Sequence, residues 1–546
     1  MGGFWLRVQA IGYGLPAVYN MDEVAIMNRA LTFATGTLNP GNFLYPTFYF
    51  YVLFAWEGLT ALVGLAMGRW DSLAGFERQF FIDPTPLFMS GRVLSAVCGT
   101  ATLLVVYHIG VRLRDHTTGL VGAALLAVAP FAVQDAHYVK HDVPVTLLIS
   151  LVPLALLSTS SRRLWWAGAT AGLAISTHYY AALAALMIVV ERLTTPEPWS
   201  QRLRGLVEAG VIAALVCVAA SPFLIPEWRT AWTDITQNRA IVMDRATTSV
   251  GMFGHLGTYL GWLFGGAALG TPVTALLAVA GLVMSGSAWR RVLPAAVFVA
   301  AFLLFIANTV PATRYLNPVL PMLTMFAGIA VSRVATRRGW LGAALALVVT
   351  VPAGWSSFQL GQFFQQDDTR TQAQRWIEQN IEAGATLLVQ PYSVPIHRSG
   401  QALAEALERS RGSLDDVPPR FARELRFAEE RMPSYRLLYL GDGGMDVDKI
   451  YISPSSVEAA GGLEPLRRLG VQWVVMKRYN EPNPSLAAFD RALAREGRLI
   501  TMFSPYRAES GQEGRPTVAP FEHNEDALRH PSLERPGPVI ELWRIE

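Results

Sequence analysis

Long apolar blocks alternate with short polar loops up to about residue 360. Most blocks hold roughly 16 to 25 residues, enough to approach or cross a ~30 Å hydrocarbon layer as a helix. The pattern predicts about 10 to 11 helical membrane spans, with candidates at about 87–111, 118–134, 143–158, 164–177, 179–191, 206–223, 260–285, 292–308, 316–334 and 340–356.

The amino-acid composition of the chain changes near residue 366, where the long apolar blocks end. Apolar positions at 373, 376, 377 and 381 have the spacing of an amphipathic helix. Short apolar runs then predict strands at 386–389, 436–440, 449–452, 471–476, 499–503 and 539–543. Helices that alternate with strands are typical of an α/β domain. We therefore expect a transmembrane catalytic domain at 1–365 and a soluble, extracytoplasmic α/β domain at 366–546.

Composition supports a polytopic α-helical membrane protein. Of the 546 residues, 52% are hydrophobic and 16% are charged, against about 25% charged in ordinary soluble domains. This balance excludes a wholly soluble enzyme, a coiled coil and a disordered chain. The formal net charge of +3 is too small to indicate nucleic-acid binding by bulk electrostatics, so no nucleic-acid partner is expected.

Arginines in the short loops predict the orientation. Positively charged loops lie on the cytoplasmic side, and five loops can do so at once if the predicted spans are correct. The loops that remain, and the domain from 366 onward, then lie outside. A multi-pass protein of a plasma membrane, of the bacterial kind, is expected. The five loops carry Arg112 and Arg114; Arg162 and Arg163; Arg192, Arg202 and Arg204; Arg290 and Arg291; and Arg333, Arg337 and Arg338.

Two segments do not fit the alternation. Residues 44–66 are apolar enough to span, but a span there would invert every later loop. We expect an amphipathic or re-entrant helix on the outer face, with Glu57 toward water. Residues 2–18 are short for a span, and we expect a truncated or tilted first span there.

The first outer loop carries the adjacent carboxylates Asp22 and Glu23. An acceptor hydroxyl or amine must lose a proton as it attacks a sugar carbon, and a carboxylate within hydrogen-bond reach can take it. A helix N-cap before 24–35 is the alternative interpretation of this pair.

The next outer loop holds Lys140, His141 and Asp142 together, and Lys140 is the only lysine before residue 449. A compact ammonium beside histidines and a carboxylate suits a phosphate group. His178 and Arg314, at outer ends of predicted spans, are further candidates for phosphate contact. The alternatives are an interfacial histidine and an arginine that extends toward the lipid surface. Arg92, just inside its span, could act in either way.

Ordered motifs along the chain resemble one family. The set resembles the GT-C glycosyltransferases that use polyprenyl-phosphate sugars, nearest to the bacterial protein O-mannosyltransferase and lipid A aminoarabinose transferase group. The matching segments are Asp22–Glu23, Leu44–Tyr–Pro46, Gly91–Arg92–Val–Leu–Ser–Ala96, Ala129–Pro–Phe131, Asp142, Thr177–His–Tyr179, Arg314–Tyr315 with Pro321, Arg370 to Trp376, and Arg535–Pro–Gly–Pro538.

The resemblance implies roles for these residues. Asp22 and Glu23 would activate the acceptor, and Asp142 would shape the site; Asp22, Glu23 and Asp142 are also the ligands of a divalent cation, if one is used. The donor phosphate would be held by Lys140, His178, Arg314, Arg92 and His141. The family often has Lys or His where this chain has Tyr45, and Lys where this chain has His178.

The expected activity is an inverting glycosyl transfer on the extracytoplasmic face. The donor is a polyprenyl-phosphate-linked sugar in the lipid bilayer, and the acceptor is a protein, a lipid or a glycan. No P-loop and no dinucleotide-binding glycine motif occurs in the first 365 residues, so no nucleotide cofactor is expected. A lipid-linked sugar flippase or transporter, or a membrane-anchored sensor, are the alternative classes.

Overall fold

The computed structural model describes residues 1–245, 251–415, 417–443, 446–512, 516–521 and 530–545, with the side chains of 241–245 left aside. The chain divides into two compact units, neither continuous in sequence. The first contains Met1–Ile11, Asn20–Thr60 and Phe88–Gly361, and the second contains Gly12–Tyr19, Ala61–Leu87 and Gln362–Glu546.

The first unit is helical throughout. Its helices, including three that run on into the second unit, are α1 (Gly2–Val8), α2 (Met21–Thr32), α3 (Phe48–Ala66), α5 (Thr85–Leu113), α6 (His116–Ala127), α7 (Pro130–Asp135), α8 (Asp142–Leu156), α9 (Arg163–Ile175), α10 (Ala185–Thr194), α11 (Trp199–Ala220), α12 (Trp228–Arg245), α13 (Gly251–Phe264), α14 (Pro272–Val283), α15 (Trp289–Ile306), α16 (Leu320–Ala335) and α17 (Gly339–Phe364). The predicted helical membrane fold is confirmed.

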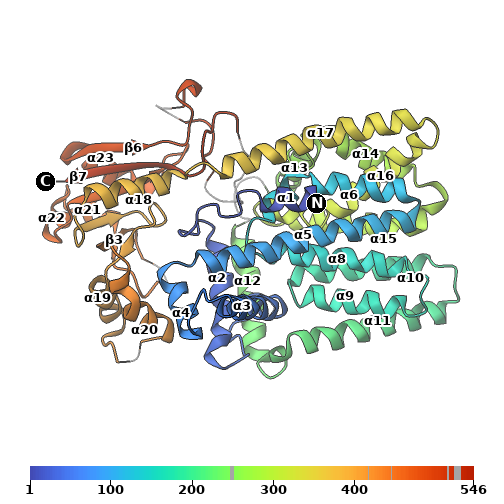
Figure 1. Cartoon of the computed structure of the whole chain (residues 1–546), viewed down its shortest axis with the longest axis horizontal. Coiled ribbons are helices and arrows are strands. Elements are labelled where there is room, and N and C mark those ends of the chain that lie inside the picture. Colours follow the sequence, from blue (N-terminus) through green and yellow to red (C-terminus); the bar gives the residue numbers. More distant parts are fainter. Residues whose placement is uncertain (246–250, 416, 444–445, 513–515, 522–529, 546) are drawn as a thin grey trace. The chain divides into compact units, whose positions relative to one another are not determined.

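Most of these helices form a bundle, and the axis of α3 lies across the direction of the bundle helices. In Figure 1, α5, α8, α9, α11 and α15 run along the page while α3 is seen nearly end-on. Among the described residues, five helical stretches are long and apolar enough to cross a membrane: Phe48–Ala66, Thr85–Leu113, Trp199–Ala220, Gly286–Ile306 and Gly339–Asn380. The crossed axis of α3 supports the predicted surface helix rather than a further parallel span.

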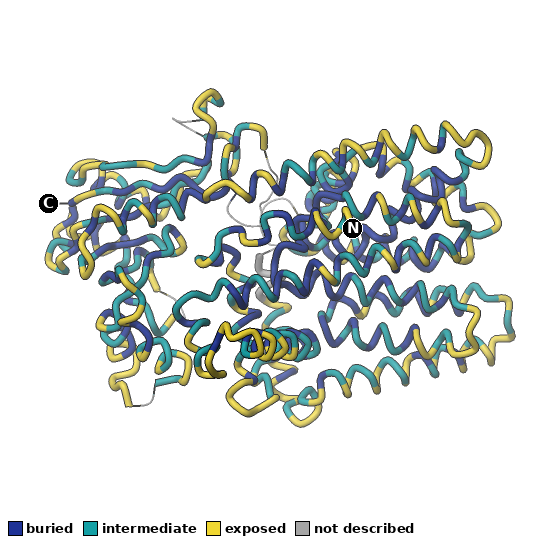
Figure 2. Tube along the Cα trace, viewed as in Figure 1, coloured by how far each residue is buried: buried dark blue, intermediate teal, exposed yellow. Residues whose placement is uncertain are grey.

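Two helices present apolar side chains outward. Figure 2 shows α11 and α17 largely exposed along their outer sides. Large hydrophobic residues account for much of this surface, including Val211 and Leu215 on α11 and Val348 and Val351 on α17. An exposed apolar stripe of this length is a lipid-facing surface in a membrane protein, because lipid tails solvate such side chains.

The predicted span at 260–285 is wrong as a single helix. It is broken into α13 and α14 by a turn in which Gly266 and Gly270 adopt positive φ angles of 88° and 85°. Thr271 then caps α14 through its side chain, and Pro272 occupies the first helical turn. Glycine accepts the left-handed conformation at little cost, and proline starts a helix but cannot continue one.

The expected exposure of Glu57 is also wrong. This residue of α3 is buried, with 1% of its surface exposed. Trp56 and Thr60 of the same helix make hydrogen bonds to Ser90 of α5, from Trp56 Nε1 to the Ser90 carbonyl at 2.9 Å and between the Thr60 and Ser90 hydroxyls at 2.5 Å. These bonds turn the polar side of α3 toward α5, and Glu57 lies on that side.

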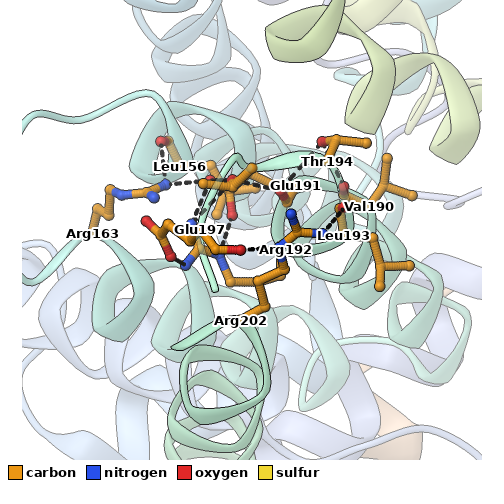
Figure 3. A network of polar contacts seen from close by, with 10 residues as sticks. Leu156, Arg163, Val190, Glu191, Arg192, Leu193, Thr194, Glu197 and Arg202 are labelled. Carbon is orange, nitrogen blue, oxygen red and sulfur yellow. Dashed lines mark hydrogen bonds and ion pairs between the residues drawn. The ribbon is translucent and has the colours of Figure 1, made fainter. Parts of the chain in front are cut away.

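The five arginine-bearing loops meet at one end of the bundle. Arg112 at the end of α5 donates to the Leu154 carbonyl of α8 at 2.6 Å, and Arg114 donates to Ser332 of α16 at 3.0 Å. A second set of bonds joins the ends of α8 to α11 (Figure 3). There Arg163 and Arg192 both donate to Glu191 at 2.6 Å. The bonds therefore bring these arginine-bearing loops together at a common end of the bundle.

Small residues allow the helices of the bundle to approach closely. A β-carbon on Gly281 of α14 would overlap the Phe326 carbonyl of α16, and one on Gly328 of α16 would lie 2.5 Å from the Thr118 carbonyl of α6. In lipid, where the hydrophobic effect does not drive helices together, such close van der Waals packing is a main source of stability.

Gly281→Val should destabilise the first unit. The new side chain meets backbone rather than a movable side chain, and overpacking of this kind costs about 1–3 kcal/mol. Unfolding of the purified protein in mixed micelles measures the loss. The matched control is Gly210→Val on α11, where a β-carbon meets nothing within 4 Å. Equal stability of the two variants would contradict the close packing of α14 against α16.

The second unit is a mixed sheet with helices on both faces. Its strands are β1 (Thr386–Val389), β2 (His397–Arg398), β3 (Ser434–Leu440), β4 (Tyr451–Ile452), β5 (Trp473–Arg478), β6 (Gly497–Phe503) and β7 (Val539–Ile545), and its helices are α4 (Leu73–Ile82), α18 (Thr369–Asn380), α19 (Gly400–Arg411), α20 (Pro419–Phe427), α21 (Pro454–Ala459), α22 (Glu464–Arg468) and α23 (Ala487–Glu496). All six predicted strands are found at or within a few residues of their expected positions, and β2 was not predicted.

The sheet order is β2–β3–β1–β5–β7–β6, with β4 beside β3. Strands β1 to β5 pair in parallel, while β7 is antiparallel to both β5 and β6. Successive residues of β1 face opposite cores, Leu387 with Ile377 of α18 and Leu388 with Phe489 of α23. The alternation expected of a strand therefore supplies both cores.

Two motifs that lie far apart in the sequence meet in this unit. The Thr369 hydroxyl donates to the Pro538 carbonyl at 2.6 Å, which joins the start of α18 to the Pro–Gly–Pro segment. Beside them, Arg370 makes a buried two-pronged ion pair with Asp368, at 2.8 and 2.7 Å, and its guanidinium lies 3.8 Å from the ring centre of Tyr19. These contacts give both motifs a structural role.

Candidate active site

Asp22 lies in the first turn of α2, with its side chain 45% exposed. Asn20, not Asp22, caps this helix, because the Asn20 side-chain oxygen accepts from the Asp22 backbone N–H at 3.1 Å. The N-cap interpretation of Asp22 is therefore wrong. Its carboxylate is left for contacts beyond its own helix.

Two buried cations hold the Asp22 carboxylate. Lys140 Nζ lies 2.8 Å from Asp22 Oδ2, and Arg314 Nη2 lies 3.9 Å from the same oxygen. Lys140 is 2% exposed and Arg314 is 9% exposed. Partial burial favours the neutral acid, but the two cations outweigh it and hold the pKa of Asp22 below its usual value. Asp22 is thus an ionised carboxylate, open on one side and paired on the other.

Glu23 points to a different partner from Asp22. It is fully buried and accepts a two-pronged hydrogen bond from Arg92 of α5, at 2.9 and 2.8 Å. It also accepts from the Val139 backbone N–H at 2.9 Å. Gly91 makes this approach possible, since a β-carbon there would lie 2.8 Å from Val139. Arg92 in turn donates to the Ile11 carbonyl at 2.7 Å.

This pair changes two of the expected roles. Glu23 was expected to act on the acceptor and Arg92 on the donor phosphate, yet the structure pairs each with the other away from solvent. Buried charges need such partners because desolvation costs several kcal/mol per ion. In the structure, these contacts of Glu23 link α2 and the 139–142 loop to α5.

Aromatic rings and imidazoles line the region next to Asp22. The ring of Tyr45 stacks on His141 with centroids 4.5 Å apart, and it meets His178 edge-on at 5.3 Å. Burial raises the pKa of the Tyr45 hydroxyl, and the charges of Asp22 and Asp142 raise it further. The negative charges of Asp22 and Asp142 both raise the pKa of the Tyr45 hydroxyl, so both carboxylates lie near Tyr45.

His141 is held as a neutral imidazole. Burial, together with Arg29, lowers its pKa to about 3. Its Nε2 atom is buried without a hydrogen-bond partner among the described residues. A buried polar atom left in this state is costly unless a ligand or water satisfies it.

Asp142 starts α8 and is 5% exposed. The Tyr180 hydroxyl lies 3.4 Å from its Oδ1 atom, and the Tyr180 ring stacks on His178 with centroids 3.7 Å apart. Asp142 is therefore linked through Tyr180 to the same cluster of rings that Tyr45 and His141 form.

Asp22, Glu23 and Asp142 are the carboxylates that a divalent cation would use if the reaction needs one. Among the described residues, no group of three or more His, Cys, Asp or Glu side chains is arranged to hold a metal ion. Lys140 occupies the position beside Asp22, and Arg92 occupies both oxygens of Glu23. Cations in these places compete with a metal for the same oxygens, so we derive no metal-dependent step.

Sequence reasoning missed three contributors. Arg29 lies seven residues after Asp22, two turns along the same face of α2, and its guanidinium is 5.8 Å from the Tyr45 ring centre. That spacing was the available signal. Tyr180 is adjacent to the His178 motif. Asn317, in the Arg314 motif, donates to Asp135 at 2.6 Å.

The Asp22 cluster lies at the end of the bundle opposite the arginine loops. Arg92 is near the start of α5, and Leu113 at its end reaches the loops. The 21 residues between them extend about 32 Å at 1.5 Å per residue. The cluster and the arginine loops therefore face opposite sides of any membrane that the bundle crosses.

One family matches the chain by sequence. Residues 87–225 match the family described as dolichyl-phosphate-mannose-protein mannosyltransferase. This segment contains Arg92, Lys140, His141, Asp142 and His178, which are five of the eight predicted site residues. No curated protein matches the chain.

The solved structures that resemble this one include two of ArnT. ArnT from Cupriavidus metallidurans in the apo state superposes with a TM-score of 0.53 at 15% identity, covering 92% of this chain and 94% of ArnT. The structure of the same protein bound to undecaprenyl phosphate gives a TM-score of 0.51, with the same identity and coverage. At this identity the likeness establishes a shared fold across both units.

Proposed function

We propose that this chain, a membrane glycosyltransferase of the GT-C fold, transfers a sugar from a polyprenyl-phosphate donor to an acceptor at the extracytoplasmic face, with inversion at the sugar carbon. The acceptor is a protein, a lipid or a glycan. The second unit lies on the same extracytoplasmic side. The match to the mannosyltransferase family and the fold shared with ArnT, which has been solved with undecaprenyl phosphate bound, support this class of donor.

One observation carries the proposal. Asp22 is a half-exposed, ionised carboxylate backed by the buried cations Lys140 and Arg314, at the end of the bundle opposite the arginine loops. A base that an acceptor can reach is thereby placed beside the positive charge that a donor phosphate needs. Transporters instead use a site near the bilayer midplane, between repeated halves of the chain.

The transfer follows from these positions. The acceptor hydroxyl or amine gives its proton to Asp22 as its lone pair forms a bond to the sugar anomeric carbon. The bond between that carbon and the phosphate oxygen breaks on the opposite side, and its electron pair leaves with the polyprenyl phosphate. Lys140 and Arg314 stabilise the negative charge that develops on the leaving phosphate.

Donor binding would also strengthen the base. In the structure, Lys140 and Arg314 hold the pKa of Asp22 down, which makes its carboxylate a weak proton acceptor. A phosphate group that draws these two cations toward itself loosens their hold on Asp22. The pKa of Asp22 then rises toward its usual value, so proton transfer becomes more favourable only when donor is present.

Neutral groups next to the cations suit the sugar itself. The unpartnered Nε2 of His141 can bond a sugar hydroxyl, and the rings of Tyr45 and His178 provide flat apolar faces with polar edges. Asp142 contacts Tyr180, whose ring stacks on His178, and would orient the donor sugar.

Mass spectrometry of glycolipids and secreted glycoproteins tests the proposal. Cells with and without the gene are compared, together with cells that carry Asp22→Asn. The expected result is a modification of constant added mass that depends on the gene and on Asp22. A chain that moves a solute into vesicles with no covalent product would overturn the proposal.

The acid side of the activity profile should move when Lys140 is replaced. Only the ionised form of Asp22 accepts a proton, so activity falls as the pH drops through the pKa of Asp22. Lys140 lowers that pKa, and Lys140→Gln should therefore shift the acid limb to higher pH, by about 1–3 units.

The measurement is the pH dependence of kcat/KM in liposomes. Arg337→Gln, an exposed arginine at the opposite end of the bundle, is the control for the lost charge. An acid limb that stays in place in Lys140→Gln would exclude Asp22 as the titrating base.

A further inference from the structure

A polar cavity opens at the arginine-loop end of the bundle. It has a volume of about 340 Å³, which lies within the ~300–1,000 Å³ range of small-ligand sites. We call it the arginine pocket, and its polar lining consists of Arg114, Arg291, Arg333, Ser285 and Ser287. Arg114 directly follows α5, Arg333 lies near the end of α16 and Arg291 lies in the first turn of α15. Ser285 and Ser287 lie between α14 and α15.

The charge of this pocket is not balanced by the protein. Arg114 is paired with Asp115, whose Oδ2 lies 3.1 Å from Arg114 Nε. No ion pair of Arg291 or Arg333 is found among the described residues. Arg333 Nε is buried without a hydrogen-bond partner there. The pocket thus offers two uncompensated guanidinium groups.

Other arginines at this end of the bundle have protein partners for their guanidinium groups. The network in Figure 3 places Glu191 and Glu197 among Arg163, Arg192 and Arg202. Arg192 donates to Glu197 at 2.8 Å, and Arg202 donates to the Glu197 carbonyl at 2.7 Å. Carboxylates thus pair with Arg163 and Arg192 where α8 to α11 end. Among the described residues, none pairs with Arg291 or Arg333.

We infer that the arginine pocket binds the phosphate group of an anionic ligand. Arginine presents paired N–H donors that match phosphate oxygens, and the hydroxyl groups of Ser285 and Ser287 add short donors beside them. A ligand phosphate would supply the negative charge that Arg291 and Arg333 lack among the described residues. The arginine pocket is about a helix length from Asp22. Ligand binding there does not depend on the sugar transfer proposed at Asp22.

Two tryptophans favour a lipid headgroup as the source of the phosphate. Trp289, two residues before Arg291, is 47% exposed. Trp340, in the first turn of α17, is 68% exposed. Exposed tryptophans at helix ends are typical of the membrane–water interface. The pocket therefore lies at headgroup depth, where basic pockets between membrane helices bind anionic lipids.

The full-length protein in detergent tests the inference by native mass spectrometry. The probes are phosphatidylglycerol and diacylglycerol, which share acyl chains but differ in the phosphate headgroup. Wild type should retain phosphatidylglycerol preferentially, and Arg291→Gln with Arg333→Gln should weaken it by about 20- to 30-fold. This corresponds to about fivefold, or ~1 kcal/mol, per arginine at an anionic surface. The matched control, Arg337→Gln with Arg338→Gln, removes the same charge from exposed positions outside the lining and should bind as wild type does.

A soluble probe distinguishes the source of the phosphate. If inorganic phosphate binds with the same dependence on Arg291 and Arg333 and phosphatidylglycerol shows no advantage over diacylglycerol, the pocket takes a free phosphate compound. If both double variants lose lipid equally, or neither phosphate probe binds, the inference is wrong. Should the pocket double variant not fold, Arg291→Gln decides alone, because that side chain is exposed and about a fivefold loss is expected.

Discussion

Asp22→Asn is expected to reduce turnover by about 100- to 10,000-fold, the contribution of a positioned general base. Asparagine has the same shape and can still accept a hydrogen bond from Lys140, but it cannot take the acceptor's proton. Because Asp22 is 45% exposed and does not cap its helix, folding should be almost unchanged. Sugar transfer from a lipid-linked donor in liposomes, scored per folded protein, is the measurement.

Two further variants separate catalysis from packing at this position. Asp22→Glu keeps the carboxylate and should retain measurable transfer, whereas a purely structural position would tolerate asparagine better than the longer glutamate. Asp71→Asn, at an exposed carboxylate outside the cluster, is the control for the loss of one negative charge. Turnover like that of wild type in Asp22→Asn would remove Asp22 from the chemistry.

Helices and strands could be predicted from the sequence where their positions depend only on hydrophobic periodicity and local charge. The helical membrane fold, the resemblance to GT-C glycosyltransferases and the strands of the second unit all follow from local patterns, and all are confirmed. The spacing of hydrophobic residues shows which face of a helix or strand is buried. A stretch of ten to twenty residues is enough to read that spacing.

Pairing across the fold could not be read in this way. Asp22 and Glu23 are neighbours with the same chemistry, yet their side chains leave α2 in different directions because adjacent residues of a helix lie about 100° apart. One carboxylate meets Lys140 and the other meets Arg92, and no local signal distinguishes the two. The exposure expected of Glu57 was wrong for the same reason, since Ser90 lies thirty residues away in sequence.

The glycines show a similar limit. Gly266 and Gly270 end one helix and begin another inside a continuous apolar block, and hydrophobicity alone joined the two into the predicted span at 260–285. Their role depends on a left-handed backbone that composition does not reveal. Gly281, by contrast, sits inside a regular helix and matters only because α16 passes beside it.

The two ends of the bundle make opposite use of arginine. At the Asp22 end, Arg314 shares its positive charge with a half-exposed carboxylate, so an incoming phosphate must compete for it. At the other end, no carboxylate of the described residues is paired with Arg291 or Arg333. Phosphate held at the first end can be released after reaction, while phosphate held at the second can remain as a structural ligand.

Glu23→Gln should cost about 3–5 kcal/mol of stability, because it leaves Arg92 as an uncompensated buried charge. Glutamine still accepts from the Val139 N–H, so the loss reports the charge rather than the hydrogen bond. Unfolding in mixed micelles measures it, and Asp367→Asn, in a well-exposed ion pair with Arg375, should cost no more than about 1 kcal/mol.

The double variant Glu23→Gln with Arg92→Met decides between a scaffold and a catalytic role. Removing both charges of a buried pair relieves the desolvation cost, so most of the lost stability should return. Transfer per folded protein should return with it, because Asp22, Lys140 and Arg314 are untouched. If stability recovers while turnover stays as low as in Asp22→Asn, Glu23 acts in the chemistry, and its burial against Arg92 would then describe only a resting arrangement of the site.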